Sequence, residues 1–269
     1  MRRSLKLYFT LISVQIRSQM EYRVSFFMDL LSTMLLNGSY FLALALILER
    51  FGNIAGWTLG DMAFIAGLSE MGFSIMDMLF SGFDPDSFSQ NVRLGKFDQM
   101  LLRPVNISLQ VFSSKFLIRR LGRFLEGAII FGVGMGLAGI HWTLAKVLYL
   151  PIVLISIVAG MGALFVMGGT LIFWTVQPVE VVNIVTYGGN ELMSYPMNIY
   201  PRWIQNVFTY LIPLVFLNYL PALYFLDKPG VLHFAPVFSF AAPFAAALML
   251  FLAFRFWSFG LRHYQSTGT

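Results

Sequence analysis

The sequence predicts an all-α protein that crosses a membrane six times and forms a single domain over residues 1–269. Composition and long apolar runs carry this prediction. Of the 269 residues, 58% are hydrophobic and only 12% are charged, whereas a soluble domain carries about 25% charge. The mean hydropathy is +0.73. Several apolar runs also exceed the ~20 residues that a helix needs to cross a bilayer.

Residues 1–22 are expected to form an amphipathic helix at the membrane interface. Between Ser4 and Gln19, apolar side chains recur at spacings of four, three and four residues, and polar side chains repeat that spacing on another face. The apolar members are Leu5, Phe9, Ile12 and Ile16, and the polar members are Lys6, Thr10, Ser13 and Arg17. A helix with two such faces lies in the membrane plane. No small-residue cleavage site follows it, so we expect no cleaved signal peptide.

Residues 24–80 are expected to hold the first two spans, at Val24–Leu48 and Leu59–Phe80. Glu70 and Asp77 lie seven residues apart in the second span, so they share one helix face. A carboxylate at mid-bilayer costs roughly 2.5–3.5 kcal/mol on insertion scales, which makes exposure to lipid unfavourable. These two residues either line a substrate path or pair with polar groups of neighbouring segments.

Residues 81–115 contain the longest charged interruption of this apolar chain. Hydrocarbon cannot solvate such a stretch, which must therefore meet water or a protein partner. Asp84 is a candidate N-cap with Pro85 at the first helical position, and Gly95 can end that helix. Asn106 can cap a new helix. Structured helices between spans suggest a docking surface, and an ordinary solvated loop is the alternative.

Residues 116–200 are expected to hold spans three to five. The helix of the third span should begin before the membrane, near Ile107, and end near Ile140. The apolar run Leu144–Val176 then exceeds the length of one span, so the fourth helix must tilt or project from the bilayer.

The segments after Gln177 allow two topologies. In one, Val179–Met193 is the fifth span and Trp203–Leu226, interrupted by Pro213 and Pro221, is a re-entrant hairpin. In the other, only the second segment crosses. Either choice gives six crossings. The last span is expected at about Phe234–Phe256, within residues 234–257, and residues 258–269 form a tail.

Positive charge predicts the orientation. If the N-terminus is inside, four of the 18 Lys and Arg residues lie outside and 14 inside. The four are Arg50, Lys146, Arg202 and Lys228. Because cytoplasmic loops carry an excess of Lys and Arg, both termini and residues 83–104 should be cytoplasmic.

Several catalytic classes have no support in the residues. A Walker A motif is absent, because Phe97 follows the Gly95-Lys96 pair and Gln90 stands where the first glycine belongs. There is no His-Glu-x-x-His motif, and the chain has no cysteine. We therefore expect no enzyme activity, no metal site and no cofactor in this chain. The basic residues follow membrane topology and do not suggest nucleic-acid binding.

Two motifs identify a family resemblance. The stretch Gly95-Lys-Phe-Asp98-Gln-Met-Leu101-Leu102-Arg103-Pro104 resembles the Gly-x-Leu-Asp-x-x-Leu-Leu-Arg-Pro signature of permease subunits of bacterial type-2 ATP-binding-cassette (ABC) exporters, with Phe97 in place of the usual leucine. The pairs Tyr195-Pro196, Tyr200-Pro201 and Ile212-Pro213, with Asn218-Tyr219-Leu220-Pro221, are similar to the C-terminal signature of one branch of that family. The resemblance covers nearly the whole chain.

The resemblance implies an exporter subunit of the bacterial cytoplasmic (inner) membrane. ATP and Mg²⁺ would bind two copies of a separate ATPase subunit, and a second permease chain, identical or homologous, would complete the transporter within the membrane lipid. It also implies that residues 201–233 are an outer re-entrant hairpin.

The resemblance further implies that residues 81–115 couple the chain to the ATPase. There we expect polar contacts from Arg93 and Arg103, apolar anchors at Phe88 and Leu94, and a role for Asp84 at the start of the element. A membrane anchor or binding subunit without a transport path is the alternative, followed by a secondary transporter.

Overall fold

The computed structural model describes residues 2–21, 23–178, 180–229 and 234–266. The described residues are 81% helical and contain no strand, so the all-α prediction is confirmed. The helices are α1 (Arg2–Met20), α2 (Arg23–Phe51), α3 (Leu59–Phe80), α4 (Pro85–Arg93), α5 (Lys96–Leu101), α6 (Ile107–Ser114), α7 (Leu121–Leu137), α8 (Leu144–Thr175), α9 (Glu180–Met193), α10 (Arg202–Asn206), α11 (Tyr219–Phe225) and α12 (Ala242–His263).

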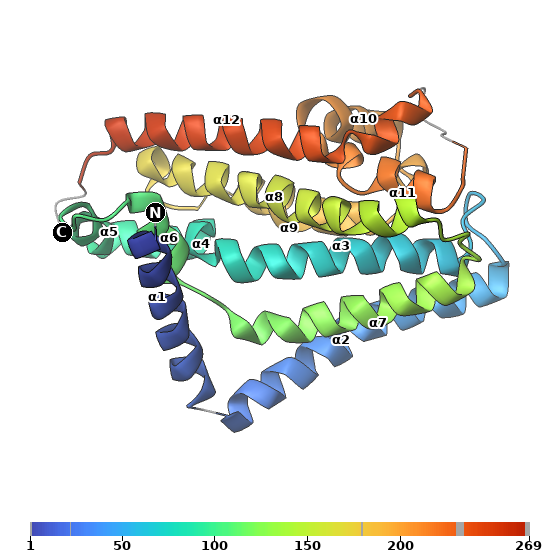
Figure 1. Cartoon of the computed structure of the whole chain (residues 1–269), viewed down its shortest axis with the longest axis horizontal. Helices are drawn as coiled ribbons and strands as arrows, with labels where there is room; N and C mark the ends of the chain where they lie inside the picture. The colour runs from blue at the N-terminus through green and yellow to red at the C-terminus, as the bar shows by residue number, and fades with distance from the viewer. Residues whose placement is uncertain (1, 22, 179, 230–233, 267–269) are drawn as a thin grey trace.

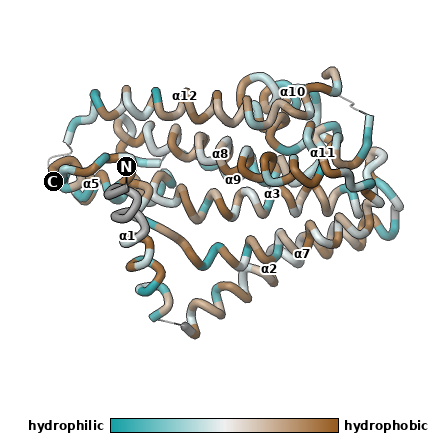
Figure 2. Tube along the Cα trace, viewed as in Figure 1, coloured by the Kyte–Doolittle hydropathy of each residue, from teal (hydrophilic) through white to brown (hydrophobic). Residues whose placement is uncertain are grey.

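The long helices run side by side in one bundle, with α8 packed between α3 and α12 and with α7 between α3 and α2 (Figure 1). Helix α1 runs across the direction of the bundle, as expected for a helix in the membrane plane. Figure 2 shows hydrophobic residues along much of α8 and hydrophilic ones around the turn that joins α2 to α3.

Four helical stretches among the described residues are long and apolar enough to cross a membrane, and a bent pair can count as a fifth. The four are Val24–Arg50, Leu59–Arg93, Leu144–Thr175 and Ala242–His263. Helix α7 has 17 residues and α9 has 14, which at 1.5 Å per residue gives about 26 Å and 21 Å. The chain is therefore a polytopic membrane protein, and the count of six spans stays a prediction.

Glycine permits the close approach of α3 and α7. A Cβ atom on Gly67 would lie 2.4 Å from the backbone nitrogen of Phe131. A Cβ atom on Gly134 would lie 2.4 Å from the backbone nitrogen of Phe64. Any side chain at either position would push the two helices apart, so the absence of Cβ atoms sets their separation.

The predicted start of the third helix near Ile107 is wrong. Helix α6 ends at Ser114, Lys115 is extended with φ −146° and ψ 126°, and α7 begins only at Leu121. Side chains of α1 stabilise the extended conformation at this break. Gln15 Nε2 donates to Ser114 O at 3.1 Å, and Gln19 bonds backbone groups of the following residues. These side chains supply hydrogen bonds that a continuous helix would have made within the backbone. The backbone polar groups at the break are therefore still hydrogen-bonded.

The last long helix also begins later than expected. Residues 236–240 form a 3₁₀ turn, and α12 runs from Ala242 to His263 instead of from Phe234 to Phe256. Pro243 lies in the first turn of α12, where its missing N–H costs no helical hydrogen bond, and it fixes the start of the helix.

The segment Trp203–Leu226 is not one continuous helix. Helix α10 continues as a π-helical turn over residues 207–211, and the chain then bends by 81° before it resumes at Leu214. Pro213 lies at the bend, where it has no N–H to continue the helical ladder.

Both ends of this bent segment contact the same turn between α2 and α3. Before the bend, Asn198 Oδ1 accepts a hydrogen bond from Trp57 Nε1 at 2.9 Å. After it, Lys228 Nζ donates to Gly56 O at 2.9 Å. The chain thus enters and leaves at one end of the bundle, the geometry of a hairpin. Residues 230–233 of the predicted re-entrant region lie outside the described residues.

Candidate functional site

Helices α4 and α5 form a short, charged unit at the end of the bundle that also holds both chain termini (Figure 1). Asp84 caps α4, because its Oδ2 accepts from the backbone N–H of Ser87 at 3.4 Å, and Pro85 follows at the first helical position. Gly95 separates the two helices with φ +64°, a conformation that favours glycine. These are the caps and breaks that the residues predict. We call residues 84–103 the α4–α5 unit.

Aromatic side chains fasten the α4–α5 unit to the ends of α8 and α12. Phe88 and Phe97 are 1% and 0% exposed. The Phe88 ring centroid lies 5.6 Å from those of Phe173 on α8 and Trp257 on α12, and Phe97 lies 5.3 Å from Phe173. Movement of the unit must therefore displace the ends of α8 and α12, because close-packed rings leave no free volume for the unit to move alone.

Phe88 is a core residue, which corrects the expectation that it anchors a partner. With 1% of its surface exposed, it offers a partner almost nothing to contact. Helix α4 has one apolar stripe, and the tertiary fold turns that stripe toward Phe173 and Trp257. A sequence motif shows that such a stripe exists but not which surface it meets.

The outer face of the α4–α5 unit combines large apolar and basic side chains. Leu94 is 65% exposed and Leu102 is 86% exposed, and Arg93 and Arg103 are exposed as well. Exposed leucines within a hydrophilic segment are typical of a protein-binding surface. Leu94, Arg93 and Arg103 were expected here. Leu102 was not among the contact residues predicted from the sequence. Its position as an apolar residue directly before Arg103 in a polar stretch could have indicated it.

The C-terminal tail binds the α4–α5 unit through Asp98. Tyr264 Oη donates to Asp98 Oδ1 and Ser266 Oγ donates to Asp98 Oδ2, each at 3.0 Å. The Tyr264 ring also packs edge-on against Phe97. Burial, together with the hydrogen bond to Asp98, raises the pKa of Tyr264 to about 12, so the hydroxyl stays a donor at physiological pH.

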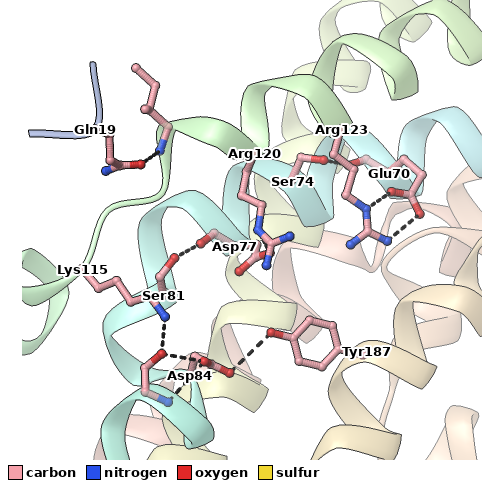
Figure 3. Close-up of polar contacts among 12 residues, drawn as sticks. Gln19, Glu70, Ser74, Asp77, Ser81, Asp84, Lys115, Arg120, Arg123 and Tyr187 are labelled. Carbon is pink, nitrogen blue, oxygen red and sulfur yellow. Dashed lines mark hydrogen bonds and ion pairs between the residues drawn. The ribbon is translucent and has the colours of Figure 1, made fainter. Parts of the chain in front are cut away.

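Glu70 and Asp77 of α3 pair with two arginines at the start of α7 (Figure 3). Asp77 Oδ2 lies 2.7 Å from Arg120 Nε, and Glu70 Oε2 lies 2.8 Å from Arg123 Nε. We call these four residues the charge ladder. The carboxylates are seven residues apart on one face of α3, and Arg120 ends the 3₁₀ turn before α7 while Arg123 lies in the first turn of α7. Of the two alternatives for Glu70 and Asp77, pairing with neighbouring groups is the one observed.

Helix α9 joins this network at two places. Asn190 Nδ2 donates to Glu70 Oε1 at 2.9 Å, and Glu191 Oε1 lies 3.8 Å from Arg123 Nη2. Further along, Tyr187 Oη donates to Asp84 Oδ1 at 3.4 Å. The charge ladder and the cap of α4 therefore share one neighbouring helix, which links the α4–α5 unit to α3 and α7.

No group of three or more His, Asp or Glu side chains that could hold a metal ion occurs among the residues that the structure describes. The polar arrangement consists of caps and ion pairs between helices. Such contacts position helices relative to one another.

Comparison with known proteins gives one match. The model of a family described as ABC-2 family transporter protein matches residues 34–268. No curated protein matches this chain, and no solved structure matches it. The matched range begins inside α2 and includes the α4–α5 unit, the charge ladder and the bent α10–α11 segment.

Proposed function

This chain belongs to the ABC-2 family of transporter proteins, and from that premise we propose that it is the transmembrane subunit of an exporter driven by a separate ATPase. The family implies association with an ABC ATPase subunit. We propose a complex of two permease chains and two ATPase chains in the bacterial cytoplasmic membrane, in which ATP and Mg²⁺ bind the ATPase chains. The missing Walker A motif agrees with this division of labour.

The α4–α5 unit is the proposed contact with the ATPase. The single observation that supports this role is a two-sided structure: exposed Leu94 and Leu102 on one side, and Phe88 and Phe97 packed on α8 and α12 on the other. A push on the exposed face would pass through the aromatic contacts to both long helices. The hydrogen bonds of Asp98 to the C-terminal tail add a second attachment to α12.

The charge ladder is proposed to keep α3 and α7 together during that motion. Its ion pairs at 2.7 and 2.8 Å are short, and the side chains of Asp77 and Arg123 are 2% and 14% exposed. Glu70 and Asp77 therefore act as structural partners of Arg123 and Arg120. The substrate would pass between the two permease chains, entering from the cytoplasm or the inner leaflet.

The decisive experiment is ATP hydrolysis by the reconstituted complex of this chain with its ATPase. The complex should hydrolyse ATP faster when its substrate is added, and drugs, lipids, peptides and polysaccharide carriers are the classes to screen. A membrane anchor without a transport path would bind the ATPase but show no stimulation by any class. A secondary transporter would show no association with an ATPase at all.

The proposed orientation predicts the labelling of introduced cysteines. The chain has no cysteine of its own, so Ser266→Cys and Asn53→Cys each provide a single thiol. Ser266 follows α12 and Asn53 lies in the exposed turn between α2 and α3. A membrane-impermeant maleimide added to intact cells should label Asn53→Cys and spare Ser266→Cys until the membrane is permeabilised. The reverse pattern would contradict cytoplasmic termini.

Ser87→Cys tests the same side of the α4–α5 unit. It should also resist the external reagent in intact cells. Because Ser87 contacts Asp84 and Lys115, its labelling after permeabilisation is expected to be slower than that of exposed Ser266→Cys.

A further inference from the structure

We infer that the junction of α1, α2 and the chain break before α7 is a binding site for the headgroup of a phospholipid that carries both a phosphate and a primary amine. A cavity of about 340 Å³ lies there. Its lining includes Gln15 and Gln19 of α1, Asp29 of α2 and Arg119 of the break. This inference requires only that the chain lies in a membrane and is independent of the transport proposal.

The wall of this cavity is fixed by hydrogen bonds from α1. Gln15 Nε2 donates to Ser114 O, and Gln19 donates to Phe116 O while its Oε1 accepts from the backbone N–H of Ile118 at 3.2 Å. Figure 3 shows the hydrogen bond between Gln19 and a backbone nitrogen of this chain segment. Because side chains hold this extended segment, Arg119 extends from a backbone of defined position.

The cavity is lined by a positive and a negative side chain, Arg119 and Asp29, and the ion pair between them is long and exposed. Arg119 Nη1 lies 3.9 Å from Asp29 Oδ2, and the two side chains are 50% and 56% exposed. Its neighbours in the charge ladder are held at 2.7 and 2.8 Å and are far less exposed. A loose, exposed ion pair contributes little by itself, so a ligand with complementary charges can replace it at small cost.

A zwitterionic headgroup matches these groups in sign. The guanidinium of Arg119 can donate two hydrogen bonds to phosphate oxygens. The Lys115 ammonium is hydrogen-bonded to Ser87 Oγ, so Arg119 supplies the positive charge for the phosphate. The Asp29 carboxylate accepts hydrogen bonds from a primary ammonium, which a trimethylated amine cannot donate.

The position of the cavity favours a lipid over a soluble ester. Asp29 lies in the second turn of α2, among apolar residues of that helix. Phe27, Met28 and Leu31 are 60%, 58% and 51% exposed in the single chain. Acyl chains attached to a bound headgroup would cover these side chains. Helix α1, which lines the cavity, runs across the bundle (Figure 1).

Native mass spectrometry of the purified full chain tests the assignment. Phosphatidylethanolamine, phosphatidylcholine and phosphatidylglycerol are titrated into detergent-solubilised protein, with free phosphoethanolamine as the soluble arm. We expect the tightest binding for phosphatidylethanolamine. Arg119→Gln and Asp29→Asn should each weaken it about tenfold, because each removes one charge-assisted contact. Arg262→Gln, an exposed arginine at the end of α12, is the matched control and should leave binding unchanged.

The remaining variants and lipids separate the alternatives. Arg119→Lys keeps the positive charge and should retain more binding than Arg119→Gln. Comparing the two variants separates the loss of charge from a folding defect of a single variant. If phosphatidylglycerol binds as tightly as phosphatidylethanolamine and Asp29→Asn has no effect, the site is a plain cationic surface and the inference fails. Equal binding of free phosphoethanolamine would assign the cavity to a soluble ester and overturn the lipid assignment.

Discussion

Leu102→Asp is expected to detach the proposed ATPase partner while leaving the chain folded. Leu102 is 86% exposed, so the folded chain gains almost nothing from its side chain. An apolar anchor that is buried in an interface is commonly worth 2 kcal/mol or more, which corresponds to roughly 30-fold weaker association after its loss. An aspartate adds the cost of desolvating a carboxylate. The measurement is co-purification of the ATPase with each variant at matched membrane expression.

Two controls separate docking from folding. Lys96→Ala changes an exposed, charged residue in the same unit and should have little effect, since a charge at the rim of an interface contributes little affinity. Phe88→Ala removes a ring that is 1% exposed and should cost about 3–5 kcal/mol of folding stability. The amount of ATPase that co-purifies with Phe88→Ala should fall in proportion to the amount of folded variant. Wild-type co-purification with both Leu102→Asp and Leu94→Asp would show that this face is not the contact.

Arg123→Met is expected to cause a large loss of stability by leaving its partner in the charge ladder unpaired. The side chains of Arg123 and Glu70 are 14% and 15% exposed, and their atoms lie 2.8 Å apart. Removal of the guanidinium leaves the Glu70 carboxylate buried with Asn190 as its remaining hydrogen-bond donor among the contacts described above. Breaking a buried ion pair on one side costs about 3–5 kcal/mol. The free energy of unfolding in detergent is the quantity to measure.

The double variant tests whether the cost comes from the unpaired charge. Glu70→Gln combined with Arg123→Met removes both charges, and it should recover most of the stability that Arg123→Met loses. Arg202→Met changes an exposed arginine at the start of α10 and should stay within about 0.5 kcal/mol of the wild type. Equal effects of Arg123→Met and Arg202→Met would mean that the charge ladder does not hold α3 to α7.

The sequence predicted most element boundaries, because the signals are local. Helix α3 occupies Leu59–Phe80 as expected, since the apolar run and its flanking turns are contiguous in the chain. Asp84, Pro85 and Gly95 fixed α4 by capping and backbone geometry, which depend on neighbouring residues alone. The break at Lys115 could not be predicted in this way, because its hydrogen bonds come from Gln15 and Gln19, about a hundred positions away.

The sequence by itself determined that the chain is an all-α membrane protein with a hydrophilic helical unit between apolar helices. Hydrophobic runs and helix caps depend only on residues that are close together in the chain. Only the tertiary structure decided which side chains of that unit face outward. Phe88 and Leu94 are both large apolar residues of the unit, yet Phe88 is buried against Phe173 and Trp257 while Leu94 is 65% exposed. It also decided that Glu70 meets Arg123, since the partner of a buried charge is set by which helix packs beside it.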